Sequence, residues 1–310
     1  SVYAAYQFYH FIGQSSAFLL EVGVTAAGTL LAIRNDIPAL AILTCIGGFL
    51  TPAMIRTGVD PQKPLFSYLF LLDSSVLLIS YLRGWRILER LAWFGTAALL
   101  IGWGNEFYTS EKFLSTFSFL TCLYGMFYVT PILRAVARNL PSSAWDLFGI
   151  VILTLGYFSI ANWMLRSDHG SWIAPLGLCL ALLQGAAGWI LQARTEDDGN
   201  RRMSAVAYGF SAFFFTFYLW EAFDGVQLTC ALAAWGAALA WIALRAGILP
   251  AAGAAVAIHC WVLGRIVFLH AVLSVSDGIL WNGRSAVFLV EAVSLGFIAW
   301  WMRRKGRPVE

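Results

Sequence analysis

Long apolar stretches alternate with short polar ones along the whole chain. Most of these stretches are close to the roughly 20 residues that a helix needs to cross the hydrocarbon core of a membrane. Backbone groups in hydrocarbon must be paired within their own segment, so each stretch is predicted to be a helix. The alternation typical of a membrane β-strand is absent. The pattern predicts eleven spans, at about 15–33, 37–54, 65–82, 87–103, 113–133, 144–165, 172–193, 204–223, 227–244, 248–269 and 284–302.

The expected fold is therefore an all-α polytopic membrane protein of about eleven transmembrane helices joined by short loops. We expect one transmembrane domain over 15–302. Aromatic residues and His10 gather in residues 1–14, which predicts an interfacial segment or the end of a truncated preceding helix. Residues 303–310 form a basic tail. The chain starts at Ser1 without a cleavable leader, which predicts that it is part of a longer polypeptide or was processed.

Two helical hairpins have similar turns. An apolar helix, an arginine turn and a proline-started helix follow one another at Arg34 and Pro38, and again at Arg245 and Pro250. Duplicated helical hairpins would explain this likeness. Ordinary local preferences for proline at a helix start and arginine at a cytoplasmic end also explain it, so both interpretations stay open.

Composition agrees with a membrane protein and gives its orientation. Hydrophobic residues make up 60% of the chain and charged residues only 12%, with a mean hydropathy of +0.73, which excludes an ordinary soluble domain. Most Lys and Arg residues lie after the odd-numbered spans and at the carboxyl end. The positive-inside rule then places the carboxyl end in the cytoplasm and Ser1 outside. The net charge of +3 follows from these arginines, so no nucleic-acid partner is indicated.

Ionisable residues inside the spans carry the functional information, because each costs a few kcal/mol near the bilayer centre unless it is paired or hydrated. In the predicted topology they lie in the outer half of the membrane or at outer helix ends. This distribution predicts a polar cavity that opens to the extracytoplasmic side. The residues proposed to line a substrate or ion pathway are Glu21, Asp73, Glu106, Asp224, Arg265 and Glu291.

Helical phase suggests specific partners for two of these residues. Asp73 and Ser80 share one face of their span, and Glu291 shares a face with Ser294. Arg265 and Glu291 lie at similar depth on consecutive antiparallel spans, so a buried ion pair is expected between them. A structural clamp and a role in anion binding or coupling are both compatible with such a pair.

No metal or cofactor is indicated. His259 and His270 are separated by about 16 Å along a helix, too far to share one metal ion, so each is predicted to be a hydrogen-bonded helix contact. The five cysteines fall inside apolar runs and are interpreted as small core residues. Phosphate-binding loops and nucleophile motifs are also absent from the sequence.

The residues Gly47, Gly48, Thr51 and Pro52 predict a special position in the second span. Small residues allow helices to approach closely, which is one interpretation. The alternative is a broken helix whose free carbonyls face the acidic residues, as in many transporters. The sequence leaves both open.

Several motifs resemble one bacterial family. They are Ile46-Gly47-Gly48-Phe49-Leu50-Thr51-Pro52, Arg83-Gly84-Trp85-Arg86, Asp224-Gly225, Gly264-Arg265-Ile266 and Trp281-Asn282-Gly283-Arg284. The chain is similar in these motifs to the predicted membrane proteins called domain of unknown function 2339. The resemblance implies a multi-pass helical protein of the bacterial cytoplasmic (inner) membrane, and it leaves the mechanism open. The chain departs from the family pattern at Asp73, where asparagine is expected.

Three functions fit the sequence, and transport or flipping of a cell-envelope component is favoured because the chain combines many short-looped spans with intramembrane charges. The alternatives are an extracytoplasmic transferase that uses a lipid-linked donor and a non-catalytic envelope scaffold. A non-enzymatic role is favoured over catalysis. The expected partners are the lipid bilayer, a lipid-linked or small envelope substrate, and a second copy or the remainder of a longer chain.

Overall fold

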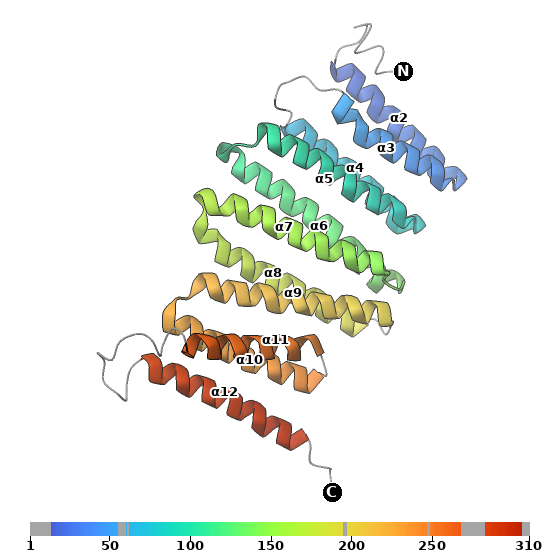
Figure 1. Ribbon diagram of the computed structural model, residues 1–310. Coiled ribbons are helices and arrows are strands. Elements are labelled where there is room, and N and C mark those ends of the chain that lie inside the picture. Colours follow the sequence, from blue (N-terminus) through green and yellow to red (C-terminus); the bar gives the residue numbers. More distant parts are fainter. Residues whose placement is uncertain are drawn as a thin grey trace. The chain divides into compact units, whose positions relative to one another are not determined.

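The computed structural model describes residues 14–54, 60, 62–194, 197–246, 249–267 and 283–305. Helices make up almost all of this part of the chain, and short turns connect those helices whose links are described (Figure 1). The eleven α-helices are α2 (Gln14–Asn35), α3 (Pro38–Met54), α4 (Gln62–Arg83), α5 (Arg86–Phe107), α6 (Phe113–Arg138), α7 (Ala144–Asp168), α8 (Ile173–Arg194), α9 (Asp198–Ala222), α10 (Gly225–Ala246), α11 (Leu249–Arg265) and α12 (Gly283–Lys305).

Each predicted span coincides with one of these helices, so the all-helical architecture is confirmed. Six helices in the described part, α4 and α6 to α10, are long and apolar enough to cross a membrane. Shorter apolar segments occur at Pro38–Pro52, Ala251–Arg265 and Val287–Trp300. The chain is therefore a multi-pass helical protein, and the count of eleven crossings stays a prediction.

The backbone divides into two compact units, Ser1–Arg134 and Ala135–Glu310, which we call unit 1 and unit 2. The single domain expected over 15–302 stays a prediction. In unit 1, α3 packs against α2, α4 and α5. The ring of Phe66 on α4 lies 4.8 Å from that of Trp103 on α5 and 5.2 Å from that of Phe119 on α6. These aromatic contacts join three helices of unit 1.

A glycine permits the sharp turn between α4 and α5. Gly84 has a φ of +75°, a left-handed conformation that costs other residues energy because of their Cβ atom. Gly84 lies inside the Arg83-Gly84-Trp85-Arg86 motif, so this part of the motif has a local structural explanation. The turn brings α4 and α5 together as an antiparallel hairpin.

In unit 2, α8 and α9 pack closely through small residues. A Cβ added at Gly177 would lie 3.4 Å from the Phe214 carbonyl oxygen on α9, and one added at Gly188 would lie 3.0 Å from the Tyr208 ring. The hydroxyl of Ser204 donates to the Gly188 carbonyl at 2.8 Å. The small residues of α8 therefore form a packing surface for α9, as is common for membrane helices.

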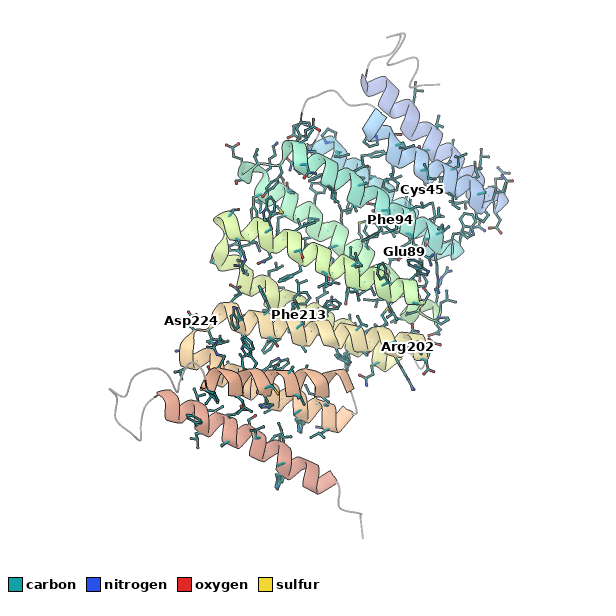
Figure 2. All side chains as sticks on the ribbon, viewed as in Figure 1. Cys45, Glu89, Phe94, Arg202, Phe213 and Asp224 are labelled. Carbon is teal, nitrogen blue, oxygen red and sulfur yellow. The ribbon has the colours of Figure 1, made fainter. Side chains whose placement is uncertain are left out.

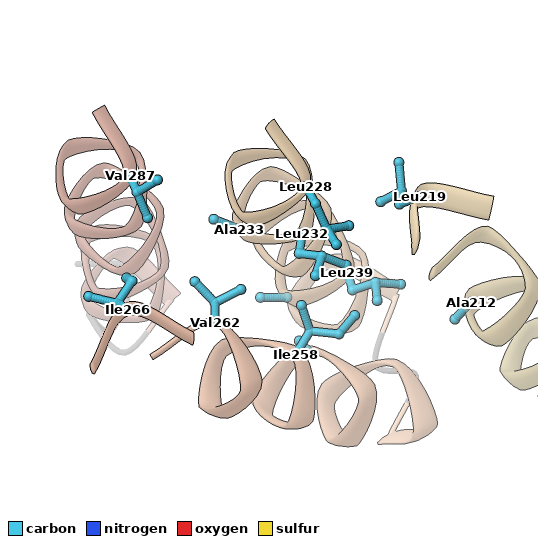
Figure 3. Packing of buried hydrophobic residues seen from close by; sticks show 12 residues of the cluster. Ala212, Leu219, Leu228, Leu232, Ala233, Leu239, Ile258, Val262, Ile266 and Val287 are labelled. Atoms are coloured by element: carbon cyan, nitrogen blue, oxygen red, sulfur yellow. The ribbon is translucent and has the colours of Figure 1, made fainter. Parts of the chain in front are cut away.

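The second part of unit 2 is built around α10, which contacts α9, α11 and α12. Figure 3 shows Ile258 and Val262 of α11 beside Leu232 and Leu239 of α10. This apolar packing fixes the positions of α10, α11 and α12 relative to one another. The cluster comprises Ala212, Leu219, Leu228, Leu232, Ala233, Leu239, Ala240, Ala255, Ile258, Val262, Ile266 and Val287.

Candidate functional site

A buried carboxylate on α4 forms the first candidate centre. Asp73 has no exposed surface, and its Oδ2 accepts a hydrogen bond of 2.7 Å from the Thr96 hydroxyl on α5. Its Oδ1 has no hydrogen-bond partner in the described part of the structure. Ser80 is also fully buried two turns along α4, so the predicted common face is confirmed. We call Asp73 and Thr96 the Asp73 centre.

The Asp73 centre contains a hydroxyl donor and no cation among its described contacts. A carboxylate that is buried with one neutral donor and one unpaired oxygen is costly to keep ionised. The Cys45 thiol of α3 is close enough for an electrostatic interaction with Asp73, and it adds no positive charge. This environment suits a neutral side chain at position 73 better than a charged one.

The glycine-rich part of α3 continues as a helix. Pro52 has no N–H, so the carbonyl of Gly48, four residues earlier, loses its helical hydrogen bond. The Tyr68 hydroxyl on α4 donates to that carbonyl at 2.7 Å, and the Thr51 hydroxyl donates to the Gly47 carbonyl at 3.0 Å. A Cβ at Gly48 would meet the Leu72 side chain at 3.1 Å, whereas Gly47 has open space. These contacts support the packing interpretation of the motif, because the Tyr68 hydroxyl binds the carbonyl that Pro52 leaves without a helical donor.

A histidine and a carboxylate form the second candidate centre, in unit 2. His259 on α11 and Glu291 on α12 are both buried, and Nδ1 lies 2.9 Å from Oε1. Nε2 lies 3.5 Å from the Ser294 hydroxyl, which donates to the Ala233 carbonyl on α10 at 3.1 Å. Gly236 of α10 gives the ring space, since a Cβ there would lie 2.9 Å from Nε2. We call His259, Glu291 and Ser294 the His259 centre.

The hydrogen bonds of the His259 centre are complete when His259 and Glu291 together carry two protons, either as an imidazolium beside a carboxylate or as a ring protonated on Nε2 beside a protonated Glu291. A doubly protonated ring donates from Nδ1 to Glu291 and from Nε2 to Ser294, while Ser294 still donates to Ala233. A neutral ring with its proton on Nδ1 leaves Nε2 as an acceptor, and the single Ser294 hydrogen cannot serve both Nε2 and the Ala233 carbonyl. Glu291 Oε2 has no hydrogen-bond partner among the described residues. The pair therefore needs one proton more than a neutral ring beside a carboxylate to complete these hydrogen bonds.

The predicted pair of Arg265 and Glu291 was wrong. Glu291 binds His259, while Arg265 donates from Nε to the Thr229 hydroxyl and from Nη2 to the Gly225 carbonyl, both at 3.3 Å. The physical reason is helical phase: six residues separate positions 259 and 265, which places their side chains about 120° apart around α11. His259 therefore faces α12 and Arg265 faces α9 and α10. The prediction that His259 is a hydrogen-bonded helix contact is confirmed.

The other predicted pathway residues lie nearer to helix ends. Glu106 is exposed at the end of α5, and Asp224 is exposed in the turn between α9 and α10 (Figure 2). Close to Asp224 in the chain, Glu221, which is not one of the predicted pathway residues, ends α9 and pairs with Arg166 of α7 at 3.0 Å. The side chain of Glu21 lies outside the described part of the structure. The predicted cavity itself stays a prediction.

Sequence reasoning missed a polar cluster in unit 1. Asp60 accepts hydrogen bonds from the Trp103 indole at 2.8 Å and from the Gln62 backbone at 3.1 Å, and it forms an ion pair of 2.7 Å with Lys112. Burial tends to raise the pKa of the Asp60 carboxyl, but the hydrogen bonds from Lys112 and Trp103 outweigh it and hold the pKa below its ordinary range. The hydrogen bond of Trp103 thereby ties α5 to this cluster.

A second missed contact joins two helices of unit 1. The guanidinium of Arg134, near the end of α6, forms an ion pair with the carboxylate of Glu89, in the first turn of α5. Arg134 is almost completely buried, and Figure 2 shows where Glu89 lies on α5. The positive-inside pattern concerns the side of the membrane on which arginines lie, so it gives no information on the partner of Arg134.

Metal ligands are not gathered in the described part of the chain. Among those residues no three His, Cys, Asp or Glu side chains come close enough to hold a metal ion. The five cysteines are free. Cys45 is buried, but Cys122, Cys179 and Cys260 are exposed, so the core interpretation was wrong for these three. Apolar residues on membrane helices also face lipid, which explains the difference.

The apolar helices and their buried polar centres define a multi-pass helical membrane protein. The chain belongs to the DUF2339 family, whose model is described as a predicted membrane protein and matches residues 1–309. The resemblance found in the sequence motifs is thereby confirmed. No curated protein and no solved structure matches the chain.

Proposed function

We propose that this protein is a carrier that moves a cell-envelope component across the membrane, and that proton binding at the His259 centre is linked to that movement. The observation that carries the proposal is the buried contact of 2.9 Å between His259 and Glu291 on two apolar helices. Ionisable groups inside a membrane are costly, and in membrane proteins they commonly mark proton relays and substrate pathways. Many apolar helices joined by short turns are also typical of carriers.

The geometry supports a link between the proton and the helices. His259 and Glu291 lie on different helices, and Ser294 connects the same centre to the backbone of α10. Loss of the proton would leave one nitrogen of the His259 ring without a hydrogen to donate. The hydrogen bonds that hold α12 against α10 and α11 would then change. A carrier needs such a link, since a bound ion must alter the balance between two arrangements of its helices.

Glu291→Gln tests the proposal with little change in side-chain shape. The protein is reconstituted in liposomes of bacterial polar lipid extract that contain a pH-sensitive dye, and a proton gradient is imposed. We expect wild-type protein to accelerate proton entry as envelope lipids are exchanged, and Glu291→Gln to return the rate to that of protein-free liposomes.

Thr154→Val is the matched control. Thr154 and Gln184 form a buried hydrogen bond between α7 and α8 at 3.3 Å that includes no titratable group, so this variant should retain the wild-type rate. A wild-type rate equal to that of protein-free liposomes would overturn the proposal. Equal rates for wild-type and Glu291→Gln protein would overturn the role of the His259 centre.

A further inference from the structure

Arg265 is held at a point where three helices of unit 2 meet. Its guanidinium donates to Thr229 and to the Gly225 carbonyl on α10, and it lies 5.8 Å from the centroid of the Trp220 ring on α9. Arg265 itself ends α11 and is partly exposed. The guanidinium is therefore fixed in position while part of it stays accessible.

Only neutral groups hold Arg265 in the described part of the structure. Arg166, at the same end of unit 2, has a carboxylate partner in Glu221 at 3.0 Å. The other acid at this end of α9 and α10 is Asp224, which is exposed in the α9–α10 turn and makes no ion pair with Arg265 among the described contacts. A cation at the edge of the hydrocarbon with neutral partners alone is costly. An anion supplied from outside the chain would remove that cost.

The surroundings of Arg265 favour an amphiphilic anion over a soluble one. Trp220 and Trp261 are 47% and 55% exposed, and their ring centroids are 6.1 Å apart. Trp261 lies one helical turn before Arg265 on α11, about 6 Å along the helix axis. Exposed indole rings are typical of the boundary between headgroups and acyl chains. A cation thus lies directly beside an exposed aromatic surface that can contact a lipid tail.

We propose that Arg265, Trp220 and Trp261 bind an anionic membrane lipid, with its phosphate on the guanidinium and the start of its tail against the indole rings. Planar guanidinium groups match phosphate oxygens well, and basic sites between membrane helices bind lipid headgroups. The inference deepens the proposed function and rests on it, because it identifies the envelope component as a phosphate-bearing lipid. The predicted topology places this site in the outer leaflet.

Native mass spectrometry of the full chain in detergent micelles tests this site with phosphatidylglycerol and the zwitterionic phosphatidylethanolamine as probes. We expect wild-type protein to retain phosphatidylglycerol preferentially and Arg265→Gln to weaken that retention by about tenfold, as expected for one lost ionic contact. Arg166→Gln is the matched control, because Arg166 already has a carboxylate partner. It should retain phosphatidylglycerol as the wild type does.

Unchanged retention in Arg265→Gln, or an equal loss in Arg166→Gln, would overturn the site. Trp261→Leu gives an independent test should Arg265→Gln fail to fold, because Trp261 is exposed; its retention should fall, and wild-type retention would also overturn the site. Displacement of the lipid by millimolar inorganic phosphate would show a free-anion site and overturn the lipid assignment. Failure of the proposed function gives a different result: wild-type protein would still bind the lipid but would not accelerate proton entry into liposomes.

Discussion

The Asp73 centre of unit 1 and the His259 centre of unit 2 both bury a carboxylate among apolar helices. The groups that form hydrogen bonds with that carboxylate differ between the two centres. Asp73 receives one hydrogen bond from the neutral hydroxyl of Thr96, on the adjacent helix of the same hairpin. Glu291 is bound by an imidazole from another helix, and Ser294 connects this pair to α10. The carboxylate of unit 1 is thus a local feature, whereas that of unit 2 holds three helices together.

Depth in the protein alone does not determine what a buried acid does. The neutral surroundings of Asp73 suit a neutral side chain at this position, which agrees with the asparagine that the family pattern leads us to expect there. Glu291 has a partner that can become a cation, so its charge and its packing are coupled. Substitutions at the two centres should therefore have effects of different size.

The largest effect is expected for His259→Leu. This change leaves the Glu291 carboxylate buried without its partner, and breaking a buried pair in this way typically costs about 3–5 kcal/mol. Unfolding of the purified protein in mixed micelles, followed by circular dichroism, measures the loss. The double variant His259→Leu/Glu291→Leu should recover much of it, because no unpaired charge remains. A double variant as unstable as the single one would contradict the pairing.

A smaller loss is expected for Gly236→Ala. The added methyl group would lie 2.9 Å from His259 Nε2, so the ring or α10 must shift, at a cost of about 1–3 kcal/mol. Gly253→Ala on α11 is the control, since its Cβ would enter open space. Equal unfolding midpoints for the two variants would show that the ring does not depend on the space at Gly236.

In unit 1, Tyr68→Phe should cost about 1–2 kcal/mol, because the Gly48 carbonyl loses its donor inside the helix bundle. The effect should shrink in a Pro52→Ala background, where a backbone N–H at position 52 can again bind that carbonyl. A double-mutant cycle of unfolding free energies measures this coupling. Additive effects would mean that Tyr68 does not compensate for the proline.

The smallest effect concerns the Asp60–Lys112 pair. Because the pKa of Asp60 is held below its ordinary value of about 3.9, the pair stabilises the folded protein above that pH and loses its contribution as the pH falls through the lowered pKa. Both side chains are partly exposed, so Lys112→Met should cost up to about 1 kcal/mol at pH 7. The difference in unfolding midpoint from wild type should shrink as the pH falls through the lowered pKa of Asp60, to the part that comes from the lost hydrogen bond of Lys112 to the Phe107 carbonyl and its contact with the Trp103 ring.

Lys63→Met is the control for this pH dependence, because Lys63 is an exposed lysine in the first turn of α4. It should match wild type throughout this pH range. A difference between Lys112→Met and wild type that grows toward low pH would contradict the direction given for the pKa of Asp60.

The positions of the helices could be predicted because the length of an apolar run and the need to pair its backbone leave few alternatives. The burial of Asp73 and Glu291 also followed from their positions within such runs. The partner of Glu291 did not, because His259 and Arg265 lie on the same short helix and only the rotation of α11 selects between them. The rotation of a helix about its own axis relative to a neighbouring helix is set by packing. A single sequence does not specify that packing.

The Asp60–Lys112 contact could not be predicted for a related reason. The two residues are far apart in the chain and meet only because α4, α5 and α6 pack together through Phe66 and its neighbours. The Tyr68 hydrogen bond could have been suspected, since a proline inside a helix always leaves one carbonyl without its usual donor. Which side chain supplies the donor depends on the facing helix.

The most direct measurement of the difference between the two centres is the unfolding free energy of Asp73→Asn beside that of Glu291→Gln in the same micelles. Asp73→Asn keeps the contact with Thr96 and removes a charge that has no described cationic partner, so its stability should equal or exceed that of wild type. Glu291→Gln weakens the charge-assisted hydrogen bond with His259 and should be less stable than wild type. A destabilisation of Asp73→Asn as large as that of Glu291→Gln would show that the two carboxylates depend equally on their charge.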